Sequence, residues 1–225
     1  MKFSRIVVWF RNDLRLHDNE ALSRAIEHGG DVIPVVCLDP RWFSKTDLGF
    51  PKTGAFRTNF LLEAIADLKK SLQKIGADLV ILQGKPEEVL QDFAVQHQAK
   101  AVFFSKEVTS EERNVDKSLE KGLFSHGIAC ESFWQSTLFH LDDLPFPVKQ
   151  TPEVFTQFRK ELEKSSPIRK EFPTPKKINL PKEVLESSSK EIPSLKSYGL
   201  DEPKQDEKSW LEMKGGESSA LGRLQ

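Results

Sequence analysis

The sequence predicts an α/β fold, in which a five-stranded parallel sheet has helices on both faces and is followed by a long connector. Two observations indicate this fold. Short apolar runs alternate with longer segments of helical periodicity through the first two thirds of the 225 residues, and the connections between them are short. The expected strands are Arg5–Phe10, Val32–Leu38, Leu79–Gln83, Ala101–Ser105 and Ala129–Trp134. The expected helices are Asn19–His28, Gly54–Ile75, Pro86–Gln96, Ser110–Ser125 and Pro152–Lys164.

Local patterns justify these elements in chain order. The first strand is a continuous apolar run, typical of a strand that is covered on both faces, and Asp18 or Asn19 is suited to cap the helix that follows. The long second helix carries apolar residues at helical spacing and is expected to end at Gly76. Pro86, followed by two acidic residues, is typical of a helix first turn, and Pro152 has the same role in the last expected helix.

The composition disfavours several classes of protein. The chain has 33 basic and 34 acidic residues and a net charge of -1, which does not suit a protein dedicated to coating nucleic acid. Cys37 and Cys130 lie in apolar, strand-like runs and are expected to be buried free thiols. The histidines show no metal-ligand spacing, so no metal is expected. No apolar stretch has membrane-spanning length and no signal peptide precedes the first strand. We therefore expect a soluble, intracellular protein, in the cytoplasm or an organelle, with no membrane partner.

The character of the chain changes after Lys164. Residues 165–203 are rich in Ser, Pro, Lys and Glu and contain few apolar side chains, which indicates an extended connector. We therefore expect an α/β domain over residues 1–164, a connector over residues 165–209 and a further segment over residues 210–225.

The loop after the first strand carries the most specific motif. Residues 8–22 read VWFRNDLRLHDNEAL, and the charges at Arg11, Asp13, Arg15 and Asp18 alternate in sign. A solvated loop that is fixed by its own ion pairs would explain these charges. The whole string, however, resembles the opening motif of the DNA photolyase/cryptochrome family. Further segments match that family in order, at residues 49–64, 84–90, 133–146 and 215–224, and residues 151–159 most resemble its DASH branch.

The resemblance implies a Rossmann-like α/β domain from a protein related to blue-light photoreception and to light-driven repair of pyrimidine dimers in DNA. Family members bind FAD in a C-terminal helical domain, of which residues 210–225 would be the truncated start. FAD and DNA are therefore expected as cofactor and partner only where that domain is present. This chain alone is expected to bind no FAD and to repair no DNA, and we identify no catalytic residue in it.

The resemblance also implies a light-harvesting chromophore, which in some family members is a folate such as 5,10-methenyltetrahydrofolate. Glu112 matches best with a pterin-binding carboxylate, Glu111 stands where the family can have asparagine, and Arg57 is a weaker candidate to face the chromophore. A carboxylate suits this role because it accepts two parallel hydrogen bonds from an aminopyrimidinone edge. Residues 110–113 are also a good helix start, with a Ser or Thr cap and acids in the first turn. For Arg57 the alternative is a surface ion pair.

The sequence also has to be compared with three other interpretations: an ATP-dependent enzyme, an interaction module and a fragment. An enzyme that activates substrates with ATP is disfavoured, because the first turn, residues 10–13, has no glycine-rich phosphate cradle. An interaction module that docks on a separate flavin-domain chain would need an exposed apolar face, to which Phe139, Leu144, Phe146 and Trp210 could contribute. The sequence could equally be a fragment of a full-length member of the DASH branch.

Overall fold

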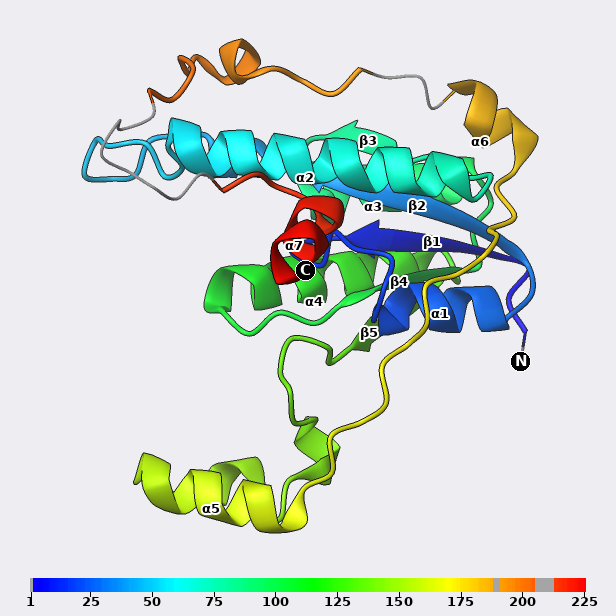
Figure 1. The fold of residues 1–225 in the computed structure, drawn as a ribbon. Helices are drawn as coiled ribbons and strands as arrows, with labels where there is room; N and C mark the ends of the chain where they lie inside the picture. Colours follow the sequence, from blue (N-terminus) through cyan, green and yellow to red (C-terminus); the bar gives the residue numbers. More distant parts are fainter. Residues whose placement is uncertain (1, 188–190, 205–212) are drawn as a thin grey trace.

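The computed structural model describes residues 2–187, 191–204 and 213–225, and it contains the expected parallel sheet (Figure 1). The strands are β1 (Arg5–Phe10), β2 (Asp31–Leu38), β3 (Val80–Gln83), β4 (Ala101–Ser105) and β5 (Ala129–Phe133). They lie in the order β3-β2-β1-β4-β5, and each neighbouring pair is parallel. Each strand lies within one residue of its expected limits, so the predicted α/β fold is confirmed.

Four helices cover the two faces of the sheet. They are α1 (Glu20–Glu27), α2 (Ala55–Lys74), α3 (Pro86–Gln96) and α4 (Ser110–Ser125). On one face, Ile6, Val8 and Phe10 of β1 pack with residues of α1 and α2. On the other face, Val7 and Trp9 pack with residues of α3 and α4. Successive side chains of a strand point to opposite faces, and cover on both faces explains why β1 is apolar from Ile6 to Phe10.

Local backbone conformation sets where the helices begin. Asn19, and not Asp18, caps α1: its side chain accepts a hydrogen bond from the N–H of the third helical residue (3.0 Å). Asp18 has a left-handed backbone conformation, with φ of 51°. The last expected helix is α5 (Phe155–Ser165), and its predicted start at Pro152 is wrong. The β-branched Val154 is extended there, with φ of -90° and ψ of 116°, so the chain approaches the helix as a loop.

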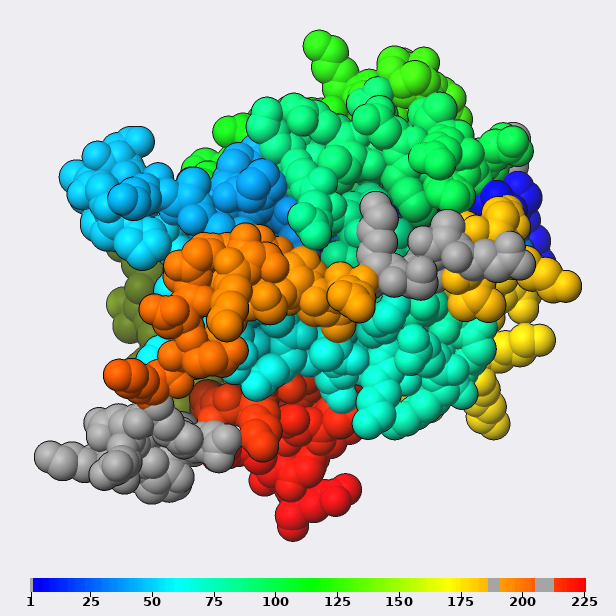
Figure 2. All heavy atoms as spheres, turned by 90° about the horizontal axis from the view of Figure 1, so that it is seen from above, coloured from blue at the N-terminus to red at the C-terminus, as the bar shows by residue number. Residues whose placement is uncertain are grey.

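Parts of the described connector pack against the α/β domain. The connector includes α6 (Lys182–Ser187) and a 3-10 helix, Leu195–Tyr198, next to α2. Figure 2 shows the segment that contains this 3-10 helix, in orange, alongside the cyan residues of α2. The side chains of Ile178, Val184 and Leu195 are at most 3% exposed. Some of the few apolar residues of this segment are therefore used in packing, whereas Ile168 and Leu185 stay exposed. Where the domain boundaries fall stays a prediction, and residues 205–212 lie outside the described part of the chain.

Residues 134–168, here called the arm, project from the end of β5 and carry α5 (Figure 1). Phe139, Leu144 and Phe146, which we expected on an exposed face, are only partly buried within the arm. Phe139 and Leu144 line an apolar groove of about 690 Å³, and Phe146 packs near Phe158 with ring centroids 5.9 Å apart. The strongly exposed apolar side chains of the arm are Leu138, Val148, Val154, Phe155 and Ile168. Trp210, the fourth residue of the expected face, lies outside the described residues.

The cysteines give a direct test of this packing. Cys37 is a buried free thiol and Cys130 is a half-buried one. Burial raises the pKa of Cys130 to about 12 and places the pKa of Cys37 well above its usual value. Because the thiolate is the nucleophile, both thiols of the native chain should react with DTNB at pH 8 more slowly than in guanidinium, Cys130 by roughly three orders of magnitude. Rapid reaction of either thiol in the native chain would contradict the burial described here.

Candidate functional site

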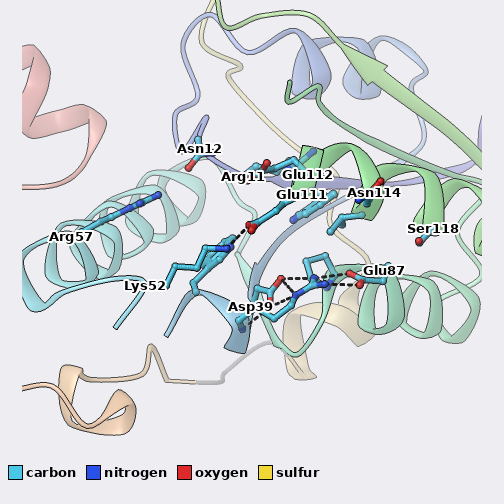
Figure 3. A pocket seen from close by; sticks show the side chains of 15 residues that line it. Arg11, Asn12, Asp39, Lys52, Arg57, Glu87, Glu111, Glu112, Asn114 and Ser118 are labelled. Carbon is cyan, nitrogen blue, oxygen red and sulfur yellow. Dashed lines mark hydrogen bonds and ion pairs between the residues drawn. The ribbon is translucent and has the colours of Figure 1, made fainter. Parts of the chain in front are cut away.

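A cavity of about 370 Å³ lies at the carboxyl ends of the central strands (Figure 3). β2 and β3 extend the sheet on one side of β1, and β4 and β5 extend it on the other. The crevice between the loops after β1 and β4 is therefore the topological switch point, where open α/β sheets bind ligands. All three residues that we predicted from the sequence, Arg57, Glu111 and Glu112, line this cavity.

Arg11 forms one wall of the cavity and is fully committed to protein contacts. Its guanidinium lies 4.4 Å from the centroid of the Trp9 ring and forms an ion pair with Asp116 of α4 (2.8 Å). Burial raises the pKa of Asp116, and the charge of Arg11 opposes that shift. The solvated-loop interpretation is thus wrong for Arg11, which is only 8% exposed and reaches across the sheet to another helix.

Asp13 fixes the loop that follows β1. Its carboxylate is 6% exposed and accepts hydrogen bonds from the N–H of Arg11 (2.8 Å), from Nδ2 of Asn19 (3.1 Å) and from Nε2 of Gln135 (2.6 Å). Gln135, at the base of the arm, also accepts a hydrogen bond from the N–H of Glu20 at the start of α1 (2.7 Å). This network holds the loop, α1 and the arm in one arrangement. Burial raises the pKa of Asp13 above its usual value.

Arg41 forms a second wall of the cavity and was not predicted from the sequence. It follows β2 in the 3-10 helix Pro40–Trp42. Its guanidinium binds both carboxylate oxygens of Asp39 (2.6 to 2.9 Å) and both of Glu87 in α3 (2.8 and 2.9 Å). The hydrogen bonds with Asp39 raise the pKa of Arg41 further, so it stays charged. Its position directly after a buried strand indicates a residue of the binding crevice. Its pairing with Glu87, which is distant in sequence, could not be predicted in this way.

The start of α4 contributes the two predicted acids. The helix begins at Ser110, with Glu111 and Glu112 in its first turn, so the helix-start interpretation holds as well; Thr109 makes no side-chain capping bond. Glu111 forms an ion pair with Lys52 and is largely exposed. Glu112 differs, because its Oε2 is buried and has no hydrogen-bond partner.

Among the charged side chains that line the cavity, those of Glu112 and Arg57 form no ion pair with any described residue. Arg11, Arg41 and Lys52 are paired with carboxylates. Arg57, on the first turns of α2, is exposed and has no hydrogen bond or ion pair with any described residue. The cavity thus presents one unused anion and one unused cation, beside the aromatic rings of Trp9 and Trp42. The other lining residues are Asn12, Pro86, Asn114, Val115 and Ser118.

Two further findings concern metal-binding groups and membrane spans among the described residues. No group of three His, Cys, Asp or Glu side chains could hold a metal ion within residues 2–187, 191–204 and 213–225. Within the same ranges, no helix is both long and apolar enough to cross a membrane.

The Asp13 network predicts a pH-dependent loss of stability on mutation. In Asp13→Asn, an amide group would face three donors, which we expect to lower the free energy of unfolding by about 1–3 kcal/mol. The folded-state pKa of Asp13 is raised, so the native state binds more protons between about pH 4 and that pKa. The stabilisation due to Asp13 therefore falls as the pH rises through this window.

Urea unfolding of wild type and Asp13→Asn across this window measures the difference. We expect the gap between the two proteins to narrow with rising pH. Asp47→Asn is the matched control, because Asp47 is exposed; its gap should stay near zero. A gap for Asp13→Asn that widens with rising pH would contradict the effect of burial on this carboxylate.

Comparison with known proteins identifies the family. The model of the DNA photolyase family matches residues 6–176. A cryptochrome DASH from Gloeobacter violaceus is 44% identical over 225 residues, which cover 100% of this chain and 44% of that protein. The crystal structure of a cryptochrome from Synechocystis sp. PCC6803 has a TM-score of 0.90 at 41% identity, over 98% of this chain and 45% of the other. A class III photolyase from Agrobacterium tumefaciens gives a TM-score of 0.75 at 29% identity, over 100% of this chain and 44% of the other.

The sequence comparisons and the structural comparisons identify the same family. The chain spans less than half of the length of the curated relatives that it matches, and the matched part includes the loop after β1 and the start of α4. The chain belongs to the DNA photolyase/cryptochrome family, with cryptochrome DASH proteins among its relatives.

Proposed function

We propose that the cavity at the β1–β4 crevice binds a folate-type antenna chromophore, with 5,10-methenyltetrahydrofolate as the ligand. One observation carries the proposal: Oε2 of Glu112 is a buried acceptor that has no partner. A buried polar group without a hydrogen bond costs about 1–3 kcal/mol. A ligand that donates to this oxygen would recover that free energy, and this supports a binding role for Glu112.

The residues present fit a folate. The pterin ring carries an aminopyrimidinone edge with two N–H donors, which matches the two parallel acceptors of one carboxylate. Trp9 and Trp42 supply aromatic surface for a planar ring system. Arg57, the unused cation, suits the carboxylates at the other end of a folate. Glu111 is the weaker candidate, because Lys52 already neutralises it.

In this proposal the chain's own residues bind and orient the ligand. Glu112 would hold the pterin edge, and the loop fixed by Asp13 would keep Arg11 and Asn12 in place beside it. The bound chromophore would absorb light and pass the excitation to a flavin. We further propose that FAD, light-driven repair of DNA and blue-light reception belong to a protein that combines this domain with a helical one.

A second proposal rests on the arm. Its exposed side chains, with Leu138 at 67% and Phe155 at 71%, border the apolar groove. Exposed apolar surface of this kind is typical of an interaction site. The chain could thus also act as a module that docks on a flavin-domain chain.

Titration with 5,10-methenyltetrahydrofolate, followed by its absorbance and fluorescence, tests the first proposal. Wild type should bind, and Glu112→Gln should bind about 5- to 150-fold more weakly, because the substitution removes the charge and one of the two parallel acceptors. Glu120→Gln, an exposed position on the same helix, is the matched control and should bind like wild type.

Circular dichroism of each variant establishes that it is folded. Equal affinity of wild type and Glu112→Gln would rule out Glu112 as the anchor. Absence of binding to a folded wild-type chain would contradict the chromophore proposal itself.

A further inference from the structure

We propose that Thr174 is a phosphorylation site for a proline-directed protein kinase, and that the added phosphate holds the connector against the loop after β1. The proposal is independent of the chromophore site. Residues 169–180, drawn in yellow in Figure 1, run from the arm past α1 towards α6. Residues 173–177 read PTPKK. This order places a proline directly after the hydroxyl of Thr174 and a lysine three positions after it, which is the pattern that such kinases select.

The sequence offers three candidate sites of this kind. Ser-Pro or Thr-Pro pairs begin at Thr151, Ser166 and Thr174. The first has no basic residue three positions later. The other two satisfy the pattern equally, with Arg169 and Lys177 three positions after their hydroxyl groups. The sequence alone therefore does not distinguish Ser166 from Thr174.

The structure distinguishes these two sites by the exposure of their side chains. The hydroxyl of Ser166 is buried and has no hydrogen-bond partner. The guanidinium of Arg169 binds both carboxylate oxygens of Asp143 (2.5 and 3.0 Å). Thr174 and Lys177 are both exposed, and Lys177 forms no ion pair with any described residue. The hydroxyl and the cation that a kinase would recognise are thus accessible at Thr174 and covered or paired at Ser166.

The backbone around Thr174 is also free to enter a kinase cleft. Residues 173–177 form no backbone hydrogen bond with any described residue, and their two prolines have no N–H to donate. The nearest backbone bonds lie on either side: Phe172 accepts from the N–H of Asp18 (2.8 Å), and Ile178 donates to the carbonyl of Ile75 (3.4 Å). A kinase can therefore bind this segment as an extended chain without first unfolding a helix or strand.

The transfer itself needs ATP and Mg²⁺, which the kinase supplies. Oγ1 of Thr174 forms a bond to the γ-phosphorus of ATP, and the bond from that phosphorus to the β–γ bridging oxygen breaks, so that ADP leaves. The proton of the hydroxyl passes to the carboxylate base of the kinase. The product is a phosphothreonine that carries a charge of about -1.5 to -2 at pH 7 and three strong acceptor oxygens.

The loop after β1 presents donors to this phosphate. Oγ1 of Thr174 lies 3.5 Å from Nδ1 of His17. Arg15 donates to the carbonyl oxygens of His17 and Asp18 (2.9 to 3.2 Å) and forms no ion pair with any described residue, so its charge can pair with a phosphate. The carboxylate of Asp18 opposes this attraction, but it already accepts a hydrogen bond from the N–H of Phe172 (3.2 Å).

The same loop is held in place from its other side. Glu217 is the first residue of the last helix, α7 (Glu217–Leu224). Its two carboxylate oxygens accept hydrogen bonds from the N–H groups of Leu16 and His17, both at 2.9 Å. Because the nearby acids are occupied by N–H donors and Arg15 is not occupied by an acid, we expect the phosphate to strengthen the contact between the connector and the loop.

Phosphate transfer by a recombinant cyclin-dependent kinase with MgATP tests the site. Mass spectrometry follows the folded chain and two synthetic peptides, residues 161–171 and 169–179, which serve as unstructured references. Thr174 should react about as fast in the chain as in its peptide. Ser166 should react about 10-fold more slowly, or slower still, in the chain than in its peptide, because its hydroxyl must first be uncovered. Thr174→Val should remove the phosphate, whereas Ser166→Ala should behave like wild type.

Three results would overturn the site in a chain that circular dichroism shows to be folded. They are absence of phosphate on Thr174, protection of Thr174 by 10-fold or more relative to its peptide, and equal rates at Ser166 and Thr174.

Amide hydrogen exchange of Asp18, measured by NMR, tests the effect of the phosphate. This N–H donates to Phe172 of the connector. Phosphorylation should slow its exchange about 2- to 5-fold, as expected for an exposed charge pair, and should slow it less in Arg15→Gln. The N–H of Gly127, which bonds to Phe124 at the end of α4, is the control and should be unchanged. Unchanged or faster exchange of Asp18 would overturn the holding role of the phosphate and leave the modification site standing.

Discussion

Asp13 places one buried carboxylate between the end of β1, the start of α1 and the base of the arm. Moving a carboxylate out of water is costly unless it accepts several hydrogen bonds. Each of the three donors therefore offsets part of the cost of burying Asp13. The network sets the course of the chain after β1. As a result, Arg11 forms an ion pair with Asp116 of α4, and Asn12 lines the cavity. The geometry of the candidate site depends on this arrangement.

The chemical character of the cavity depends on which of its charged side chains are already paired. Arg11 and Arg41 form ion pairs with nearby carboxylates, so the charges in these two walls of the cavity are neutralised by protein partners. Glu112 and Arg57 are left over, and one oxygen of Glu112 is buried without a partner. Buried polar groups in native proteins are nearly always hydrogen-bonded. Ser166 and Tyr198 are further exceptions among the described residues, but of the three only Glu112 lines the cavity, which supports a ligand there. The family resemblance also predicts Glu112 and Glu111, and more weakly Arg57, as residues of a chromophore site, and that role stays a prediction.

Much of the fold could be predicted from the sequence, because strand and helix periodicity are local. The limits of β1, β4, α3 and α4 follow directly from apolar runs and first-turn residues. Contacts between distant positions could not be predicted in the same way. Arg11 and Asp116 are 105 residues apart, Asp13 and Gln135 are 122 apart, and Arg41 and Glu87 are 46 apart. The packing of Ile178 and Val184 depends equally on tertiary structure, which is why their segment resembles an exposed connector in sequence.

A crystal structure of the chain with 5,10-methenyltetrahydrofolate would test the central claim most directly. The claim is that the crevice between β1 and β4 is a folate site anchored by the unpartnered carboxylate of Glu112. The account predicts the pterin edge within hydrogen-bond distance of Oε2 of Glu112, between residues that follow β1 and those that begin α4. A ligand bound elsewhere, with Glu112 contacting protein or solvent only, would contradict it.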